Sequence, residues 1–415
     1  MTLLAAQLEH HSPIPQHESA ALRSFYDSAW GRQWTPLNNI RVIATPPGSL
    51  PGHIDDDAPV INIATSTLEL EPGTPLDQTY TCYGSLHTLF LALGLAEDHF
   101  GEEGVLVVRP EYELLRERLM SGDLERFERV VVTGHPGIGK TMCMLYILLY
   151  RLHRKLPTAI EVRSGEFTIF DGQGCTTYTN QISASSAAHE RLKACWALSD
   201  SNAHVTIPSI SFVSRAARVV QFTSPEEKRW KGWSKEWGAV LVIMDLPTML
   251  DIAAVAHAYS HSPTEALTLA SEFGPSLRTL QSLLDGHLYL ASLRSQIQDQ
   301  TQLLCSDAHL ASSLSGFNLI EPDHEKVDAL VYLRPLRRWR SAGQELRTDE
   351  GHIVIRAGED GVLVEKRWMA EYCIPSHSQR ENVKDVERGL STGTSSQLSR
   401  ALGSLTTHNV DGPWP

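Results

Sequence analysis

The chain has 415 residues, of which 42% are hydrophobic and 20% charged, so disordered, collagen-like and coiled-coil classes are excluded. Its net charge of −13 is concentrated in residues 1–108, which carry −10, and this argues against indiscriminate nucleic-acid binding by the whole chain. The six cysteines form no C-x-x-C pair, so we expect free thiols. We expect neither a signal peptide nor a membrane span, and an intracellular location in the cytoplasm or nucleus.

The first quarter of the chain predicts a mixed α+β region. Apolar residues recur at helical spacing over residues 20–30, which predicts an amphipathic helix. Short β-like runs at 40–43 and 60–63 lie between turn residues, and residues 85–95 predict a second helix. A strand at 105–108 and a helix at 110–119 are expected next.

Strands and helices alternate in the middle of the chain, which predicts a parallel sheet covered by helices on both faces. An apolar helix is expected over 140–156, and residues 248–295 read as largely helical. Trp230, Trp233 and Trp237 recur at helical spacing, which is typical of a core-facing or docking stripe. Strands are predicted at 129–133, 158–162, 167–170, 193–199, 217–223 and 239–244.

The last third of the chain is less regular. Residues 352–356 and 361–366 predict a hairpin, and residues 334–340 form a basic cluster with one aromatic side chain. From residue 376 onward Ser, Thr and Gly dominate, which predicts a disordered tail.

The strongest motif, G-x-x-x-x-G-K-[ST], occupies residues 134–141 between a predicted strand and a predicted helix. Its glycines leave backbone N–H groups free to surround a phosphate, and the start of the helix attracts the anion. Lys140 would lie between the β- and γ-phosphates, and Thr141 would offer its hydroxyl to Mg²⁺. The predicted nucleotide-binding residues are Gly134, His135, Pro136, Gly137, Ile138, Gly139, Lys140, Thr141 and Met142.

A carboxylate for Mg²⁺ is expected where a parallel strand ends, at the edge of the sheet that faces the ligand. Asp200 ends an apolar run and is our candidate, with Asp245 in reserve. The alternative for Asp200 is a turn or helix-cap role. The predicted metal ligands are therefore Thr141 and Asp200.

Three further polar residues are candidates for phosphate contacts. Thr223 and Ser224 end a strand beside that of Asp200, where a sensor of the γ-phosphate would lie; a capped strand end is the alternative. Arg278 could reach the phosphates, or it could be a solvated arginine. The predicted catalytic set is Lys140, Asp200, Thr223, Ser224 and Arg278.

No carboxylate follows Asp200, where many ATPases carry a glutamate that polarises the attacking water; Ser201 and Asn202 occur instead. We therefore expect slow hydrolysis by the isolated chain. A glutamate from elsewhere is the alternative, with Glu161 and Glu166 as candidates. Arg215 and Arg218 are weak candidates for an arginine finger.

An ordered set of motifs resembles the P-loop ATPase module of Crinkler-type and retrotransposon-hotspot-type proteins of fungi, oomycetes and trypanosomatids. The set covers roughly residues 105–295 and comprises residues 107–112 (VVRPEY), the loop at 134–141, 196–200 (WALSD), 222–225 (FTSP), 229–237 and 273–278 (FGPSLR). The resemblance implies an ASCE-type P-loop fold with an AAA-like small helical region. It also implies Asp200 as the metal-side acid, Thr223 or Ser224 as the sensor, and Arg278 as a second sensor.

The predicted fold class is thus an α/β P-loop NTPase fold of ASCE/AAA-like type. The predicted division is an acidic N-terminal extension (1–104), the NTPase core (105–247), a helical lid-like region (248–300), a C-terminal α+β region (301–375) and the tail (376–415).

The predicted function is Mg²⁺-dependent ATP binding with slow hydrolysis, which would make the chain an ATPase. A nucleotide-binding scaffold without turnover is one alternative. The regulatory ATPase part of a nucleic-acid-acting effector or mobile-element protein is another. The candidate partners are another protein or a second copy of the chain, and nucleic acid through the basic cluster at residues 334–340; no membrane is expected.

Overall fold

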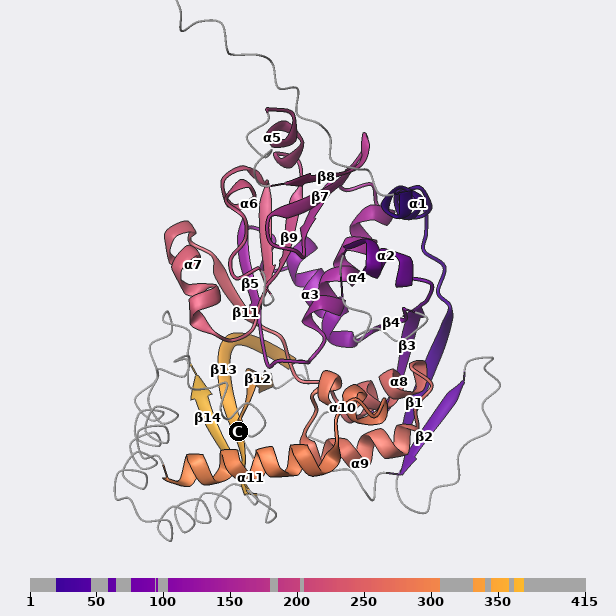
Figure 1. The fold of residues 1–415 in the computed structure, drawn as a ribbon, viewed down its shortest axis with the longest axis vertical. Coiled ribbons are helices and arrows are strands. Elements are labelled where there is room, and N and C mark those ends of the chain that lie inside the picture. The colour runs from indigo at the N-terminus through magenta and orange to yellow at the C-terminus, as the bar shows by residue number, and fades with distance from the viewer. Residues whose placement is uncertain are drawn as a thin grey trace, which may run out of the picture.

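The computed structural model describes residues 20–45, 59–64, 76–93, 95, 104–179, 186–201, 205–306, 331–339, 345–357 and 362–368 (Figure 1). The tail predicted to be disordered, residues 376–415, lies outside the described residues.

A seven-stranded sheet in the order β11-β5-β10-β9-β6-β7-β8 forms the centre of the molecule. Its first five strands in this order run parallel to one another, which confirms the predicted parallel sheet. The strands are β5 (Arg129–Thr133), β6 (Thr158–Glu161), β7 (Glu166–Asp171), β8 (Gly174–Thr179), β9 (Trp196–Asp200), β10 (Arg218–Phe222) and β11 (Val240–Ile243).

Strand β7 departs from the parallel pattern that the alternation of elements predicts. It runs antiparallel to β6, and β8, which was not predicted, pairs antiparallel with β7. Only residues 162–165 separate β6 from β7. A parallel connection needs a crossover of about a dozen residues, so this short link can form only a hairpin-like reversal.

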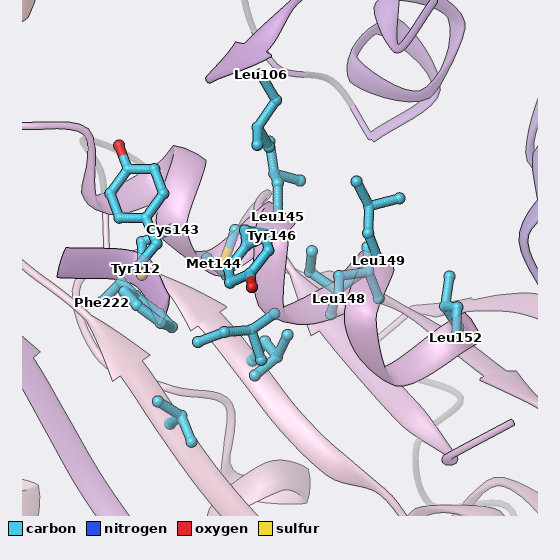
Figure 2. Packing of buried hydrophobic residues seen from close by; sticks show 14 of the residues in the cluster. Leu106, Tyr112, Cys143, Met144, Leu145, Tyr146, Leu148, Leu149, Leu152 and Phe222 are labelled. Carbon is cyan, nitrogen blue, oxygen red and sulfur yellow. The ribbon is translucent and has the colours of Figure 1, made fainter. Parts of the chain in front are cut away.

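Helices cover both faces of the central sheet, as predicted (Figure 1). Helix α4 (Lys140–His153) follows β5 and packs with α3 (Pro110–Ser121) on one face, where its leucines meet Leu106, Tyr112 and Phe222 (Figure 2). The opposite face is covered by α6 (Ile210–Arg215) and α7 (Lys231–Trp237), while α5 (Ser186–Leu192) precedes β9.

The core-facing interpretation of the tryptophan stripe is confirmed for two of its members. Trp230 and Trp233 are 8% and 6% exposed and belong to the apolar cluster between the sheet and α7. Trp237 is partly buried against the same cluster.

A second, four-stranded sheet forms the N-terminal part, in the order β2-β1-β3-β4. Its strands are β1 (Asn38–Thr45), β2 (Val60–Ala64), β3 (Asp77–Tyr83) and β4 (Leu106–Val108). Strand β3 was not predicted, although its polar residues alternate with the buried Tyr80 and Cys82, which is the pattern of a half-buried strand. Strand β4 extends this sheet past the predicted boundary at residue 104, while the division into domains itself stays a prediction.

The N-terminal sheet and the predicted helical region share one apolar core. Helix α8 (Met249–Ala258) packs against β1, β3 and β4, α9 (Pro263–Phe273) packs on α8, and α10 (Leu277–Leu284) packs on α9. Helix α11 (Leu290–Ser306) follows them. Helices α1 (Ala20–Ala29) and α2 (His87–Leu93) instead join the core around α4.

A three-stranded antiparallel sheet follows in the C-terminal part, in the order β12-β13-β14. Strands β13 (Glu345–Ala357) and β14 (Val362–Trp368) pair antiparallel, which confirms the predicted hairpin. Strand β12 (Val331–Trp339) contains most of the basic cluster at 334–340. Among the described helices, none has the length and apolar character needed to cross a membrane.

Candidate functional site

The motif at residues 134–141 forms the turn between β5 and α4. Its glycines have positive φ values and lie close to neighbouring side chains. Gly137 and Gly139 have φ values of +77° and +91°. A Cβ at Gly137 would lie 2.4 Å from the Ser276 hydroxyl oxygen, and one at Gly139 would lie 2.2 Å from that of Tyr112. A larger side chain at either position would strain the backbone and force the neighbouring side chain to move.

Thr141 and Asp200 meet at the carboxyl edge of the sheet. The Thr141 hydroxyl lies 3.2 and 3.1 Å from the two carboxylate oxygens of Asp200, which ends β9 and is 7% exposed. Burial raises the pKa of Asp200 to about 6, against the Thr141 hydrogen bond and the charges of Lys140 and Arg278, which lower it. The pair offers hydroxyl and carboxylate oxygens, the donors that Mg²⁺ prefers, so the residues present fit this ion.

Lys140 lies at the start of α4 with its ammonium directed at the loop. Its Nζ donates to the backbone oxygens of Gly134 at 2.8 Å and His135 at 2.7 Å. Burial, followed by the charge of Arg278, lowers the pKa of Lys140 to about 7, and Asp200 opposes this shift. An added anion beside this ammonium would favour its charged form.

The remaining loop residues have distinct environments. His135 is buried, and burial, aided by the charge of Lys140, lowers its pKa to about 3, so it is neutral at pH 7. Ile138 is fully buried in the core and anchors the loop. Pro136 and Met142 are half-buried, and Met142 packs against the same core.

The helical region reaches the loop through the start of α10. The backbone N–H of Arg278 donates to the Gly137 oxygen at 3.2 Å. Ser276, which caps α10, lies beside Gly137 as well. The structure thus places the backbone of Arg278 beside the loop, while a contact of its side chain with phosphate stays a prediction.

Thr223 lies one residue beyond β10, beside the strand that leads into the loop. Its N–H donates to the Val132 oxygen at 2.9 Å, and its side chain is fully buried. The hydroxyls of Thr223 and of Thr133, the last residue of β5, are buried without a hydrogen-bond partner among the described residues. Thr133 was not predicted, although its place directly before the motif could have indicated it. Ser224 is half-buried.

Asp245, the reserve candidate, is occupied elsewhere. Its N–H donates to the Glu111 carboxylate at 2.9 Å, and its own carboxylate accepts from the Leu246 N–H at 2.7 Å. The geometry thus favours Asp200 over Asp245 as the neighbour of Thr141.

The candidates for a water-polarising glutamate are not beside Asp200. Glu161 pairs with Ser199, so it faces the side of the sheet opposite to that of Asp200 and α4. Its carboxylate accepts from the Ser209 N–H at 2.9 Å, at the start of α6. Glu166 begins β7 and faces Arg163 at 3.5 Å.

The two arginine-finger candidates differ in availability. Arg218 is 4% exposed, donates to the Leu119 and Leu124 oxygens, and stacks over Trp196 at 4.3 Å, so it cannot extend to a neighbouring subunit. Arg215 is exposed at the end of α6.

Comparison with known proteins adds little to this description. No family model and no curated protein matches the chain. Among solved structures, AMPPCP-bound DnaA from Aquifex aeolicus has 10% identity and a TM-score of 0.31 and covers 50% of this chain and 74% of its own. RuvB from Thermotoga maritima has 11% identity and a TM-score of 0.26, with 57% and 90% covered. At these scores neither likeness carries the assignment, and the P-loop NTPase-like fold rests on the sheet and the loop.

Proposed function

We propose that the chain binds a nucleoside triphosphate, ATP, together with Mg²⁺ at residues 134–141. The observation that carries this proposal is the meeting of Thr141 and Asp200 beside the loop that holds Lys140. These residues are 59 positions apart, and the fold brings the hydroxyl and the carboxylate into hydrogen-bond distance. A glycine-rich turn that served only to connect β5 to α4 would not require that meeting.

Each element of the site has a distinct task in binding. The loop N–H groups and the start of α4 would hold the phosphates. The Lys140 ammonium would leave the backbone oxygens of Gly134 and His135 and donate to phosphate oxygens instead. Thr141 and Asp200 would hold Mg²⁺, which neutralises phosphate charge. The buried hydroxyl of Thr223 and the start of α10 with Arg278 would complete the polar surroundings of the triphosphate.

We further propose that the chain belongs to the ASCE class with an AAA-like helical region. Strand β10 lies between the loop strand β5 and the Asp200 strand β9, and this additional strand supports the class. The likeness to Crinkler and retrotransposon-hotspot ATPases rests on the ordered sequence motifs.

Slow hydrolysis is the reaction we propose, with water attacking the γ-phosphate in line. One observation favours a second candidate, a nucleotide-binding scaffold without turnover. Ser201, at the position after Asp200, donates its hydroxyl to the Thr206 oxygen at 3.0 Å and offers no carboxylate to orient water. Steady-state turnover compared with Lys140→Ala separates the two candidates.

Calorimetric titration of the full chain with an ATP analogue and Mg²⁺ tests the binding. Lys140→Ala should weaken affinity about 10- to 100-fold, the effect of losing a charged hydrogen bond to a phosphate. Lys193→Ala is the control, because Lys193 is exposed and pairs with Glu190 at 2.6 Å, away from the loop. Equal affinity in wild type and Lys140→Ala would overturn the proposal.

A further inference from the structure

Arg109 is a buried arginine between β4 and α3, in the VVRPEY segment that the proposed function leaves unused. Its side chain is 1% exposed. Burying a guanidinium is costly unless hydrogen bonds and an opposite charge compensate it. Its partners come from two separate parts of the molecule.

The first partner belongs to the phosphate loop. One terminal N–H of Arg109 donates to the backbone oxygen of Ile138 at 2.7 Å. A trans peptide holds its C=O and N–H in opposite directions, and the described chain contains no cis peptide. Anchoring the Ile138 oxygen therefore directs the N–H of Gly139 away from Arg109, and Arg109 determines the orientation of one of the loop's donors.

The second partner belongs to the helical region. The Nε of Arg109 donates to the Asp251 carboxylate at 3.1 Å, and Asp251 is 3% exposed. The same carboxylate accepts from the Thr248 N–H at 3.0 Å, in the capping box that begins α8. It also accepts from the Tyr80 hydroxyl on β3 at 2.8 Å.

The ring of Tyr112 completes the connection. The guanidinium of Arg109 lies 5.3 Å from the centre of this ring. The Tyr112 hydroxyl occupies the space beside Gly139 that a Cβ would need. Arg109 thus contacts the loop directly through Ile138 and indirectly through Tyr112.

We infer that Arg109 is a positioning residue that couples the phosphate loop to α8 through Asp251. Nucleotide binding that moves the Ile138–Gly139 peptide also moves the Ile138 oxygen, to which Arg109 donates. The same guanidinium donates to Asp251 at the start of α8, so the movement reaches this helix. Nucleotide occupancy and the stability of α8 are therefore linked, and each favours the other to the same degree. This inference rests on the proposed nucleotide binding.

The chemistry of the link requires an arginine. A guanidinium presents several donors in a fixed planar arrangement, so one side chain holds Asp251 and Ile138 at the same time. A lysine has a single ammonium on a flexible stem and keeps the charge beside Asp251 without that fixed geometry. Arg109→Lys therefore preserves the buried ion pair and removes the connection to the loop.

Hydrogen exchange of the full chain, measured with and without an ATP analogue and Mg²⁺, tests the coupling. In wild type, nucleotide should slow exchange both in residues 134–141 and in α8, Met249–Ala258. Arg109→Lys should bind nucleotide about three- to tenfold more weakly, the effect of one lost hydrogen bond, and still protect the loop. Its α8 amides should no longer respond to nucleotide.

Asp251→Asn breaks the same link from the other side and is the second variant. It should also lose the α8 response, and the double variant should lose no more than either single one. Arg116→Lys is the matched control, because Arg116 lies on the same helix α3 and contacts Tyr146 and Tyr150 instead. Its α8 response should equal that of wild type.

The possible results separate this inference from the proposed function. A nucleotide response of α8 that persists in both Arg109→Lys and Asp251→Asn would overturn the coupling, as would nucleotide binding to wild type without any α8 response. Failure of wild type to bind nucleotide in the accompanying calorimetry would overturn the proposed function and the coupling together. A purely structural role for Arg109 would lower the melting temperature of the variants and leave the α8 response in place.

Discussion

Glu161 is a buried carboxylate whose protonation should make the stability of the protein depend on pH. Its side chain is 2% exposed, and it accepts hydrogen bonds from the Ser209 N–H and the Ser199 hydroxyl. Burial raises its pKa from the ordinary 4.5 to about 7, although both hydrogen bonds lower it. The folded protein therefore binds this proton more tightly than the unfolded chain does.

The sign and size of the effect follow from this pKa difference. A raised carboxyl pKa gives stabilisation that is fully present below pH 4.5 and is lost as pH rises through about 7. At 1.36 kcal/mol per pKa unit, the free energy of unfolding should fall by about 2.5 kcal/mol between pH 5 and pH 8 through Glu161 alone. Glu161→Gln keeps an acceptor for Ser209 and removes the titration.

Urea unfolding at pH 5 and pH 8 measures this effect. We compare the free energy of unfolding of Glu161→Gln with that of wild type at each pH. The difference, variant minus wild type, should be about 2.5 kcal/mol larger at pH 8 than at pH 5. Glu166→Gln is the control, because its side chain is 38% exposed and lies on the neighbouring strand. If the stability change of Glu161→Gln is the same at both pH values, the reasoning about this buried carboxylate is refuted.

Three further predictions concern the loop and the reaction. Gly139→Ala should weaken nucleotide binding and lower the melting temperature more than Gly165→Ala does. The two positions have similar φ values of +91° and +87°, but only at Gly139 would the added Cβ collide with a neighbour, Tyr112. Equal melting temperatures of the two variants would contradict this prediction. Asp200→Asn should leave the fold intact and reduce the Mg²⁺ dependence of ATP binding in calorimetry, and an unchanged dependence would remove Asp200 from the metal site. Turnover of the dilute wild type should lie below the roughly 1–10³ s⁻¹ typical of enzymes, because Ser201 replaces a water-orienting carboxylate; a typical rate in a phosphate-release assay would show that one chain carries the full catalytic set.

The sequence predicts those parts of the site that depend on local order. The motif places Lys140 and Thr141 at the start of a helix, and the apolar run before Asp200 places that carboxylate at the end of a strand. Because parallel strands end at one edge of a sheet, the two halves of the site could be expected to meet, and Thr141 and Asp200 do so.

Other features depend on contacts between distant segments and could not be predicted. Arg109 and Asp251 are 142 positions apart, and neither lies in a pattern that indicates a partner. The position of Glu161 on the far face of the sheet depends on its register with Ser199 on β9. The direction of β7 differs from these cases, because the short connection at residues 162–165 is visible in the sequence and already excludes a parallel crossover, which the prediction of a parallel sheet overlooked.

The central claim is that residues 134–141 hold the phosphates of a nucleotide. An experimental structure of the full chain with a non-hydrolysable ATP analogue and Mg²⁺ tests it most directly. The account predicts the β-phosphate within the loop, Lys140 turned from the Gly134 and His135 oxygens to the phosphates, and the ion beside Thr141 and Asp200. A nucleotide bound elsewhere, or a loop that stays empty with Lys140 still on its own backbone at saturating nucleotide, would contradict it.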